Sequence, residues 1–318
     1  MNPTNPRTLP YGEAAIAEAV RVIAGGGCVA VPTETVYGLA ADATDSRAVA
    51  GIYAAKGRPS FNPLIVHVPD LAEAERIAVF DDFARALAER FWPGPLTLVL
   101  PVREGSGIAA LVTAGLDTIA IRVPAHRAMQ ALLAACGVPL AAPSANASGG
   151  ISPTRAAHVV ASLAGRIPLV IDDGATAAGV ESTIVIGREV LRPGPLTVEM
   201  LFPGEGRGPA GDTPTGPRPS PGKEGVVAPG QLESHYAPSK PLRLNAIEAQ
   251  AGEWLIGFGA VAGGETLSAT GDLTEAAANL FDALHRADAN AAFAIAIAPI
   301  PETGIGVAIN DRLRRAAH

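Results

Sequence analysis

A stretch of proline and glycine divides this chain into two unequal parts. Residues 203–230 read PGEGRGPAGDTPTGPRPSPGKEGVVAPG and contain almost no large apolar side chain. Such a segment cannot bury a core, because proline and glycine disfavour regular structure and there is little apolar surface to remove from water. The sequence therefore predicts two folded units, residues 1–202 and residues 241–318, joined by a connecting segment over residues 203–240.

The cores of both units must be built mainly from small aliphatic side chains. The chain has 318 residues, which is enough for two domains, and 48% of them are hydrophobic but only 4% aromatic. The formal net charge is −7. A general nucleic-acid binder normally has a basic balance, so the charge argues against that role while still allowing a local basic pocket.

Several other classes of protein are disfavoured by the sequence. The two cysteines, Cys28 and Cys136, lie far apart and neither belongs to a C-x-x-C pair, which argues against a zinc site or a disulfide framework. The first residues lack the apolar stretch of a signal peptide. The apolar run at residues 291–300 is too short to cross a bilayer. We therefore expect a cytoplasmic protein without membrane contact.

Polar side chains follow the ends of several apolar runs in residues 25–67. A strand over residues 28–31 leads into a loop of hydroxyls, and a helix beginning at Asp45 ends in a Gly- and Pro-restricted basic loop. A second strand then follows. The polar groups at these ends are Thr35, Lys56, Arg58, Asn62 and His67. Their order along the chain allows all of them to reach one pocket.

Each of these residues also has an ordinary structural interpretation. A lysine near a helix C-terminus is usually solvated and favoured by the helix dipole, and a histidine in an apolar strand is usually a hydrogen-bonded core residue. However, Lys56 and Arg58 place two positive charges close together in a restricted loop. That arrangement suits an anion with several oxygens.

Eight short motifs, taken in order, resemble the YrdC-like family. They are residues 32–39 (PTETVYGL), 56–59 (KGRP), 62–64 (NPL), 118–124 (TIAIRVP), 143–146 (PSAN), 182–185 (STIV), 192–194 (RPG) and 235–238 (HYAP). No single motif would suffice, but this many in the order of the family are highly specific. In two-domain members the resemblance implies synthesis of L-threonylcarbamoyl-AMP from L-threonine, bicarbonate and ATP with release of pyrophosphate. The threonylcarbamoyl group then serves the threonylcarbamoyladenosine modification of tRNA.

The alternation of apolar strands and amphipathic helices predicts an α/β fold. The family resemblance implies an open, twisted, mixed sheet with helices and a concave active-site face, followed by a smaller Rossmann-like α/β domain. It also implies that residues 203–240 act as linker and active-site lid, with His235 and Tyr236 reaching back across the pocket. The family's usual Ser-Pro-Gly-Met in this segment is replaced by residues 228–231 (APGQ).

The resemblance also assigns roles to individual residues. The threonine-binding set is Thr35, His67, Arg122, Ala142 and Ser182. The ATP-binding set is Lys56, Arg58, Asn62, Thr118, Ser144, Ser152, Arg192 and Tyr236. Lys56 and Arg58 are expected to stabilise the charge of the transition state. Mg²⁺ is expected to be held by phosphate oxygens, without a protein metal site, and a tRNA threonylcarbamoyl transferase complex and a weak RNA contact are the expected macromolecular partners.

The residues themselves are compatible with that chemistry. They offer cations, hydroxyls and amides, but no Ser-His-Asp pattern with the expected local motif, so covalent catalysis is not indicated. Such a set suits a site that gathers several anions and holds them in reactive geometry.

Three other functions agree less well with the sequence. A carbamoyltransferase that forms carbamoyl-adenylate for hydrogenase cofactor assembly would bring an acylphosphatase-like region and paired cysteines, which this sequence lacks. An RNA-binding module without catalysis is opposed by the acidic balance. An amino-acid sensor is suggested only by the second domain.

Overall fold

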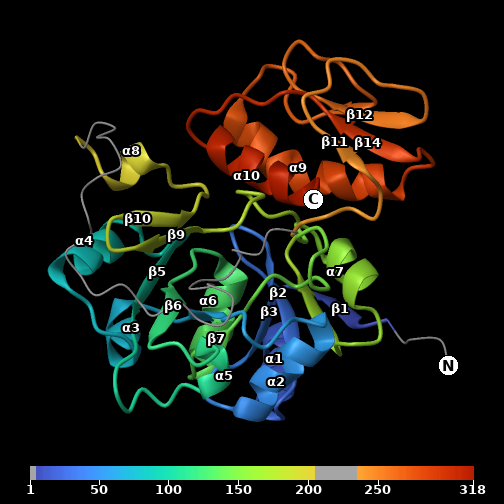
Figure 1. The fold of residues 1–318 in the computed structure, drawn as a ribbon. Helices are drawn as coiled ribbons and strands as arrows, with labels where there is room; N and C mark the ends of the chain where they lie inside the picture. Colours follow the sequence, from blue (N-terminus) through green and yellow to red (C-terminus); the bar gives the residue numbers. More distant parts are fainter. Residues whose placement is uncertain (1–4, 205–234) are drawn as a thin grey trace.

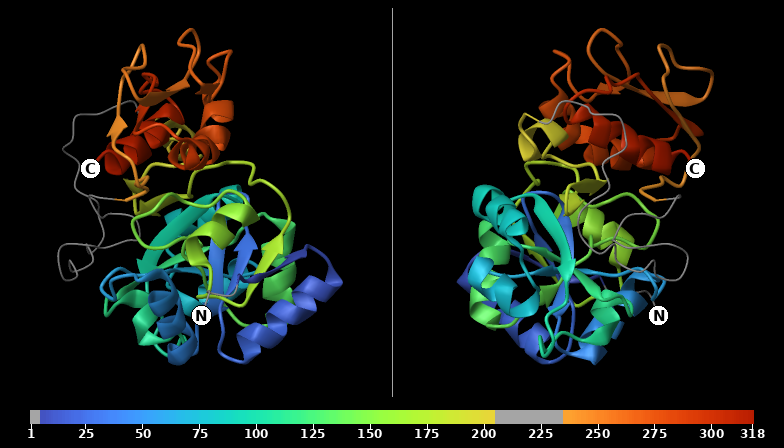
Figure 2. Two further views of the ribbon diagram at one scale, coloured as in Figure 1. Left: turned by 90° about the vertical axis from the view of Figure 1, so that its right-hand side faces the viewer. Right: turned by 60° about the vertical axis from the view of Figure 1, so that its left-hand side comes forward.

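Two sheets, each covered by helices, make up the part of the chain that the structure describes. The computed structural model describes residues 5–204 and 235–318. A ten-stranded mixed sheet lies in the first part and a four-stranded parallel sheet in the second. The helices α9 (Leu273–Ala289) and α10 (Gly306–Ala316) lie between the small sheet and the rest of the molecule (Figures 1 and 2). The expected α/β class, with a large mixed sheet and a smaller second α/β unit, is confirmed.

The large sheet has the spatial order β1-β8-β2-β3-β7-β4-β6-β5-β9-β10. Its strands are β1 (Arg7–Pro10), β2 (Val29–Pro32), β3 (Tyr37–Asp42), β4 (Ile65–His67), β5 (Leu96–Pro101), β6 (Thr118–Arg122), β7 (Leu140–Ala141), β8 (Leu169–Asp172), β9 (Thr183–Ile186) and β10 (Glu189–Arg192). The helices of this unit are α1 (Glu13–Ala24), α2 (Ser46–Lys56), α3 (Leu71–Ile77), α4 (Asp82–Phe91), α5 (Ala110–Thr113), α6 (Arg127–Cys136), α7 (Ala156–Leu163) and α8 (Val198–Leu201).

The small sheet has the order β11-β14-β12-β13. Its strands are β11 (Leu242–Arg243), β12 (Glu253–Gly257), β13 (Glu265–Thr266) and β14 (Ala294–Ile297). The linker motif at residues 228–231 lies outside the described residues, whereas His235 and Tyr236 lie inside them. Within the described ranges, no helix is both long enough and apolar enough to span a bilayer.

Local chemistry fixes the position of the basic loop. The side chain of Asp45 accepts a hydrogen bond from the backbone N–H of Arg47 and so caps the start of α2. The helix ends at Gly57, whose φ of 62° is a left-handed conformation that glycine adopts without strain. Lys56 is therefore the last helical residue, and Arg58 leaves in the turn that follows.

Strand β3 forms where the residue pattern predicts no strand. Its sequence, YGLAAD, is rich in glycine and alanine, which have low strand propensity. It nevertheless pairs with β2 as a hairpin, with Pro32 opposite Tyr37. The Thr33 hydroxyl closes the turn by donating to the carbonyl of Val36 at 2.7 Å. The hydroxyl loop is thus the tip of a hairpin, and burial of every strand residue except Asp42 outweighs the weak local preference of β3.

The sheet register places two predicted site residues next to each other. Strands β4 and β6 are parallel, and His67 lies opposite Arg122. On its other side, β4 pairs with β7, whose end leads to Ala142. Polar groups at the ends of several neighbouring strands therefore meet at one edge of the sheet.

A cluster of charged and aromatic side chains joins the two units beside α7 and α9. His158 and His285 stack with ring centroids 3.8 Å apart. The Asp282 carboxylate lies 3.2 Å from His158 Nε2 and 3.1 Å from Arg155 Nε. Burial, together with the neighbouring His285, lowers the pKa of His158 from 6.5 to about 4, although Asp282 acts in the opposite direction.

This cluster predicts a loss of stability in acid. A histidine whose pKa is lower in the folded than in the unfolded state takes up a proton on unfolding. Its contribution to the free energy of unfolding therefore falls as the pH drops from about 6.5 towards 4. In His158→Phe, which retains a ring that can stack but cannot titrate, the loss of unfolding free energy between pH 7.5 and pH 5 should be smaller by about 1 kcal/mol after allowance for solvent screening. Urea unfolding at both pH values measures this, and an unchanged difference would contradict it.

Candidate active site

A pocket opens at this edge of the large sheet, and most of the predicted site residues line it. The lining comes from both described parts of the chain. It consists of Thr33, Thr35, Val36, Gly38, Arg58, Ile65, His67, Arg122, Ala142, Pro143, Ser144, Glu181, Ser182, Arg192, His235 and Tyr236. Four predicted residues, Lys56, Asn62, Thr118 and Ser152, are not part of this lining.

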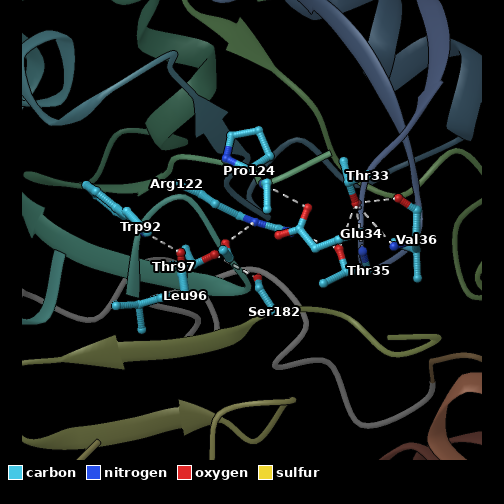
Figure 3. A network of polar contacts seen from close by, with 12 residues as sticks. Thr33, Glu34, Thr35, Val36, Trp92, Leu96, Thr97, Arg122, Pro124 and Ser182 are labelled. Carbon is cyan, nitrogen blue, oxygen red and sulfur yellow. Dashed lines mark hydrogen bonds and ion pairs between the residues drawn. The ribbon is translucent and has the colours of Figure 1, made fainter. Parts of the chain in front are cut away.

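Arg122 lies at the centre of a polar network that Figure 3 shows from close by. Its Nη1 donates to the Thr35 hydroxyl at 3.0 Å and its Nε to the Gly94 carbonyl at 3.2 Å. Its Nη2 forms an ion pair with Glu34 at 2.5 Å, and the other carboxylate oxygen of Glu34 accepts the backbone N–H of Ala125 at 3.1 Å. A guanidinium carries five N–H donors, so two remain for a carboxylate that enters the pocket.

Glu34 was not among the predicted site residues. The sequence places it between the two threonines of the hydroxyl loop, which was the available signal, but its ion pair with Arg122 joins segments far apart in the chain. Because the pair fixes one edge of the guanidinium, it also orients the remaining donors.

The Ser182 hydroxyl links Thr97 of β5 to Arg192 of β10. It lies 2.7 Å from the hydroxyl of Thr97, and it accepts a hydrogen bond from Arg192 Nη2 at 3.0 Å. The same Arg192 nitrogen also donates to the Ser182 carbonyl at 3.0 Å. Arg192 is buried yet keeps its position because β10 and β9 form adjacent antiparallel strands.

The two histidines of the pocket are neutral. Burial, reinforced by Arg122, lowers the pKa of His67 to about 3. Burial also lowers the pKa of His235 to about 3; Glu181 opposes this shift, whereas Arg58 and Lys56 favour it. Within the described residues, Nδ1 of each ring has no hydrogen-bond partner. The rings therefore offer hydrogen-bonding groups without adding positive charge.

Arg58 is held by the backbone that follows it. Its Nε donates to the Asn62 carbonyl at 3.2 Å and its Nη2 to the Pro63 carbonyl at 2.9 Å. Burial lowers its pKa to about 10, which leaves the guanidinium charged at neutral pH. A charged group held by fixed carbonyls needs no reorganisation when an anion arrives.

Lys56 is positioned differently from Arg58. Its Nζ donates to the carbonyls of Ser144 and Asn146, each at 2.5 Å, and so lies behind the loop that carries Ser144. Burial, followed by the nearby charge of Arg58, lowers its pKa well below the usual value. In this geometry Lys56 shapes the loop, and its direct contact with a reacting group stays a prediction.

Several buried polar atoms have no partner in the described part of the chain. Among them are the side-chain oxygen and nitrogen of Asn62, the hydroxyls of Thr118 and Tyr236, and Nη2 of Arg312. Unsatisfied buried polar groups are rare because each costs desolvation energy, and one common reason for them is a ligand. Of these, Asn62, Thr118 and Tyr236 belong to the predicted ATP-binding set.

A carboxylate in the pocket wall was also missed by the sequence analysis. Glu181 precedes the STIV motif and accepts a hydrogen bond from the hydroxyl of Ser152. Burial alone would raise the pKa of Glu181, but Arg312 and Arg192 hold it below its usual value. Over the described ranges, no group of three or more His, Cys, Asp or Glu residues could hold a metal ion.

Comparison with known proteins identifies the family of this chain. Residues 21–194 match the family described as "Telomere recombination", and residues 197–318 match "Threonylcarbamoyl-AMP synthase, C-terminal domain". Two similar curated proteins are the threonylcarbamoyl-AMP synthases of Bacillus subtilis and Pyrococcus abyssi. Each is 39% identical; the alignments cover 97% and 94% of this chain, respectively, and 94% of each relative.

The fold agrees with these matches. The crystal structure of P. abyssi Sua5 complexed with L-threonine superposes with a TM-score of 0.84 at 37% identity and covers 99% of this chain and 98% of that one. The E. coli YciO structure, 21% identical, covers 57% of this chain and 90% of its own, with a TM-score of 0.50, and shows the fold alone. The resemblance expected from the motifs is confirmed, and the chain belongs to the threonylcarbamoyl-AMP synthase family.

Proposed function

We propose that this protein synthesises L-threonylcarbamoyl-AMP from L-threonine, bicarbonate and ATP, with release of pyrophosphate. The observation that supports this most directly is the pairing of two kinds of anion receptor in one pocket. Arg122, with Thr35 and Ser182, forms one receptor. Arg58 and Arg192 line the same pocket and form the second, and Arg192 hydrogen-bonds Ser182 of the first. The family membership and the L-threonine in the similar P. abyssi structure point to the same function.

The first receptor suits the amino acid. The donors that Arg122 has left after binding Glu34, Thr35 and Gly94 can take the carboxylate of threonine. Neutral His67 and the Ser182 hydroxyl lie in the same pocket and can hydrogen-bond the substrate's polar groups. We expect Ala142 to contribute its backbone.

The second receptor suits the triphosphate. In the proposed reaction, the threonine amine condenses with bicarbonate to a carbamate and water, and a carbamate oxygen then attacks the α-phosphorus as pyrophosphate leaves. Negative charge grows on the phosphate oxygens during this attack. Arg58 and Arg192 are fixed by backbone carbonyls and can stabilise that charge without rearranging. We assign the nucleotide contacts to these two residues together with Asn62, Thr118, Ser144, Ser152 and Tyr236.

Mg²⁺ is proposed to enter with ATP through its phosphate oxygens. The donors that line the described pocket are mostly cations and hydroxyls, and the carboxylate among them, Glu181, is bound to Arg312. Such a donor set does not fit a protein-held metal, whereas Mg²⁺ commonly binds through substrate phosphates and water. The product would then serve a transferase that modifies tRNA.

The first test of this proposal is substrate dependence. Pyrophosphate release from ATP should require threonine and bicarbonate together, because the carbamate is the attacking group. The measurement is coupled detection of pyrophosphate in degassed buffer, with each substrate omitted in turn. Equal release with threonine alone would indicate an aminoacyl-adenylate instead. Dependence on carbamoyl phosphate in place of threonine would favour the alternative carbamoyltransferase.

The second test distinguishes the role of Arg58 from that of Lys56. Arg58→Met should lower kcat by about 10²-fold with little change in threonine affinity, because it removes a preorganised charge from the pocket. Lys56→Met should mainly raise the KM for ATP and lower the Tm, since the carbonyls of Ser144 and Asn146 lose their donor. Arg47→Met, at an exposed position on α2, the helix that ends at Lys56, is the matched control. Wild-type kinetics in a folded Arg58→Met would contradict the assignment.

A further inference from the structure

Arg312 reaches from the C-terminal unit to the wall of the pocket. It lies on α10, and its side chain is fully buried, with an exposed fraction of 0%. Helix α10 lies between the small sheet and the large one (Figure 1), and the Arg312 side chain hydrogen-bonds Glu181 and Pro193 of the first unit. A fully buried arginine is unusual unless its charge is paired.

Three separate segments meet at this guanidinium. Its Nε donates to the Glu181 carboxylate at 2.8 Å, and its Nη1 donates to the Pro193 carbonyl at 2.9 Å. Its central carbon also lies 5.3 Å from the centre of the Tyr236 ring, within the range of a cation–π interaction. Asp311 on the same helix accepts a further hydrogen bond from Nη1 at 2.7 Å.

These partners belong to the pocket wall or adjoin it. Glu181 and Tyr236 line it directly, and Pro193 follows Arg192, which also lines it. Through Glu181 the contact extends to the hydroxyl of Ser152. No comparable contact from Arg312 to the threonine receptor is present in the described residues.

Tyr236 depends on such contacts for its conformation. Its φ of 65° lies in the left-handed region, which a bulky residue adopts only when its surroundings enforce it. Phe281 of α9 lies 5.6 Å from its ring, and the neighbouring Ala237 N–H donates to the Gly149 carbonyl at 2.8 Å. Arg312 thus holds the ring from the side of the C-terminal unit.

Arg312 also offsets a negative charge that would otherwise repel a nucleotide. The Glu181 carboxylate is buried in a wall that must receive phosphates, and like charges at close range repel. Its ion pair with Arg312 offsets the charge of that carboxylate.

We propose that Arg312 is a positioning residue for the nucleoside triphosphate, so that the C-terminal unit forms part of the active site. The inference rests on the proposed function, because it assigns this wall to ATP. Arg312 acts through Glu181 and Tyr236 and leaves threonine binding to the other receptor.

The test compares Arg312→Met with Arg314→Met in the full-length protein. Methionine keeps most of the apolar stem of arginine and removes the charge. Arg314 lies on the same helix, is more than half exposed and pairs with the exposed Glu302, so it is the matched control. Kinetics are measured as pyrophosphate release with ATP and threonine varied separately, and threonine binding is measured by calorimetry.

Arg312→Met should raise the KM for ATP by about 10- to 100-fold, the range expected for loss of a charged hydrogen bond, with threonine affinity changed less than about threefold. Arg314→Met should behave as wild type.

Two further variants test the inference even if Arg312→Met does not fold. Arg312→Lys keeps the charge but not the planar guanidinium, and should show an intermediate KM for ATP. Arg312→Met combined with Glu181→Gln removes both buried charges, and the two effects should be less than additive. An unchanged KM for ATP in folded Arg312→Met, or in Arg312→Lys and the double variant if the first does not fold, would overturn the inference. Absence of product from the wild-type protein would instead overturn the proposed function.

Discussion

The active-site architecture depends on keeping positive charge buried inside an aliphatic core. Removing a cation from water is costly unless its N–H groups find fixed acceptors. Lys56, Arg58 and Arg192 meet this requirement largely through backbone carbonyls of nearby loops. These loops are consequently fixed in shape, and the same burial keeps His67 and His235 neutral. The buried charges, the conformation of the loops and the protonation state of the histidines therefore depend on one another.

Much of this arrangement could be predicted from the sequence. The apolar runs that end in polar residues correctly indicated that groups such as Thr35 and His67 would meet at one edge of a sheet. The helix caps at Asp45 and Gly57 fixed where the basic loop begins. These features are local, because capping groups and strand ends are encoded within a few residues of one another.

The remaining features depend on contacts between distant segments. Strand β3 forms despite a weak local preference because neighbouring strands bury it. Glu34 and Glu181 enter the site through Arg122 and Arg312, partners that no local pattern connects to them. The position of Lys56 behind the Ser144 loop likewise depends on how α2 packs under a segment almost ninety residues later.

The strand order of the large sheet has a consequence for how the chain folds during synthesis. Strand β1, near the N-terminus, pairs in parallel with β8, and the same β8 also pairs with β2. The first residues made therefore have no sheet partner until residue 172 has left the ribosome. Contacts of such high sequence separation slow folding, because a long loop must close before they form. Strand β2 can pair early with β3, but its other edge stays unpaired over that interval, and an unpaired strand edge of this kind is prone to aggregation.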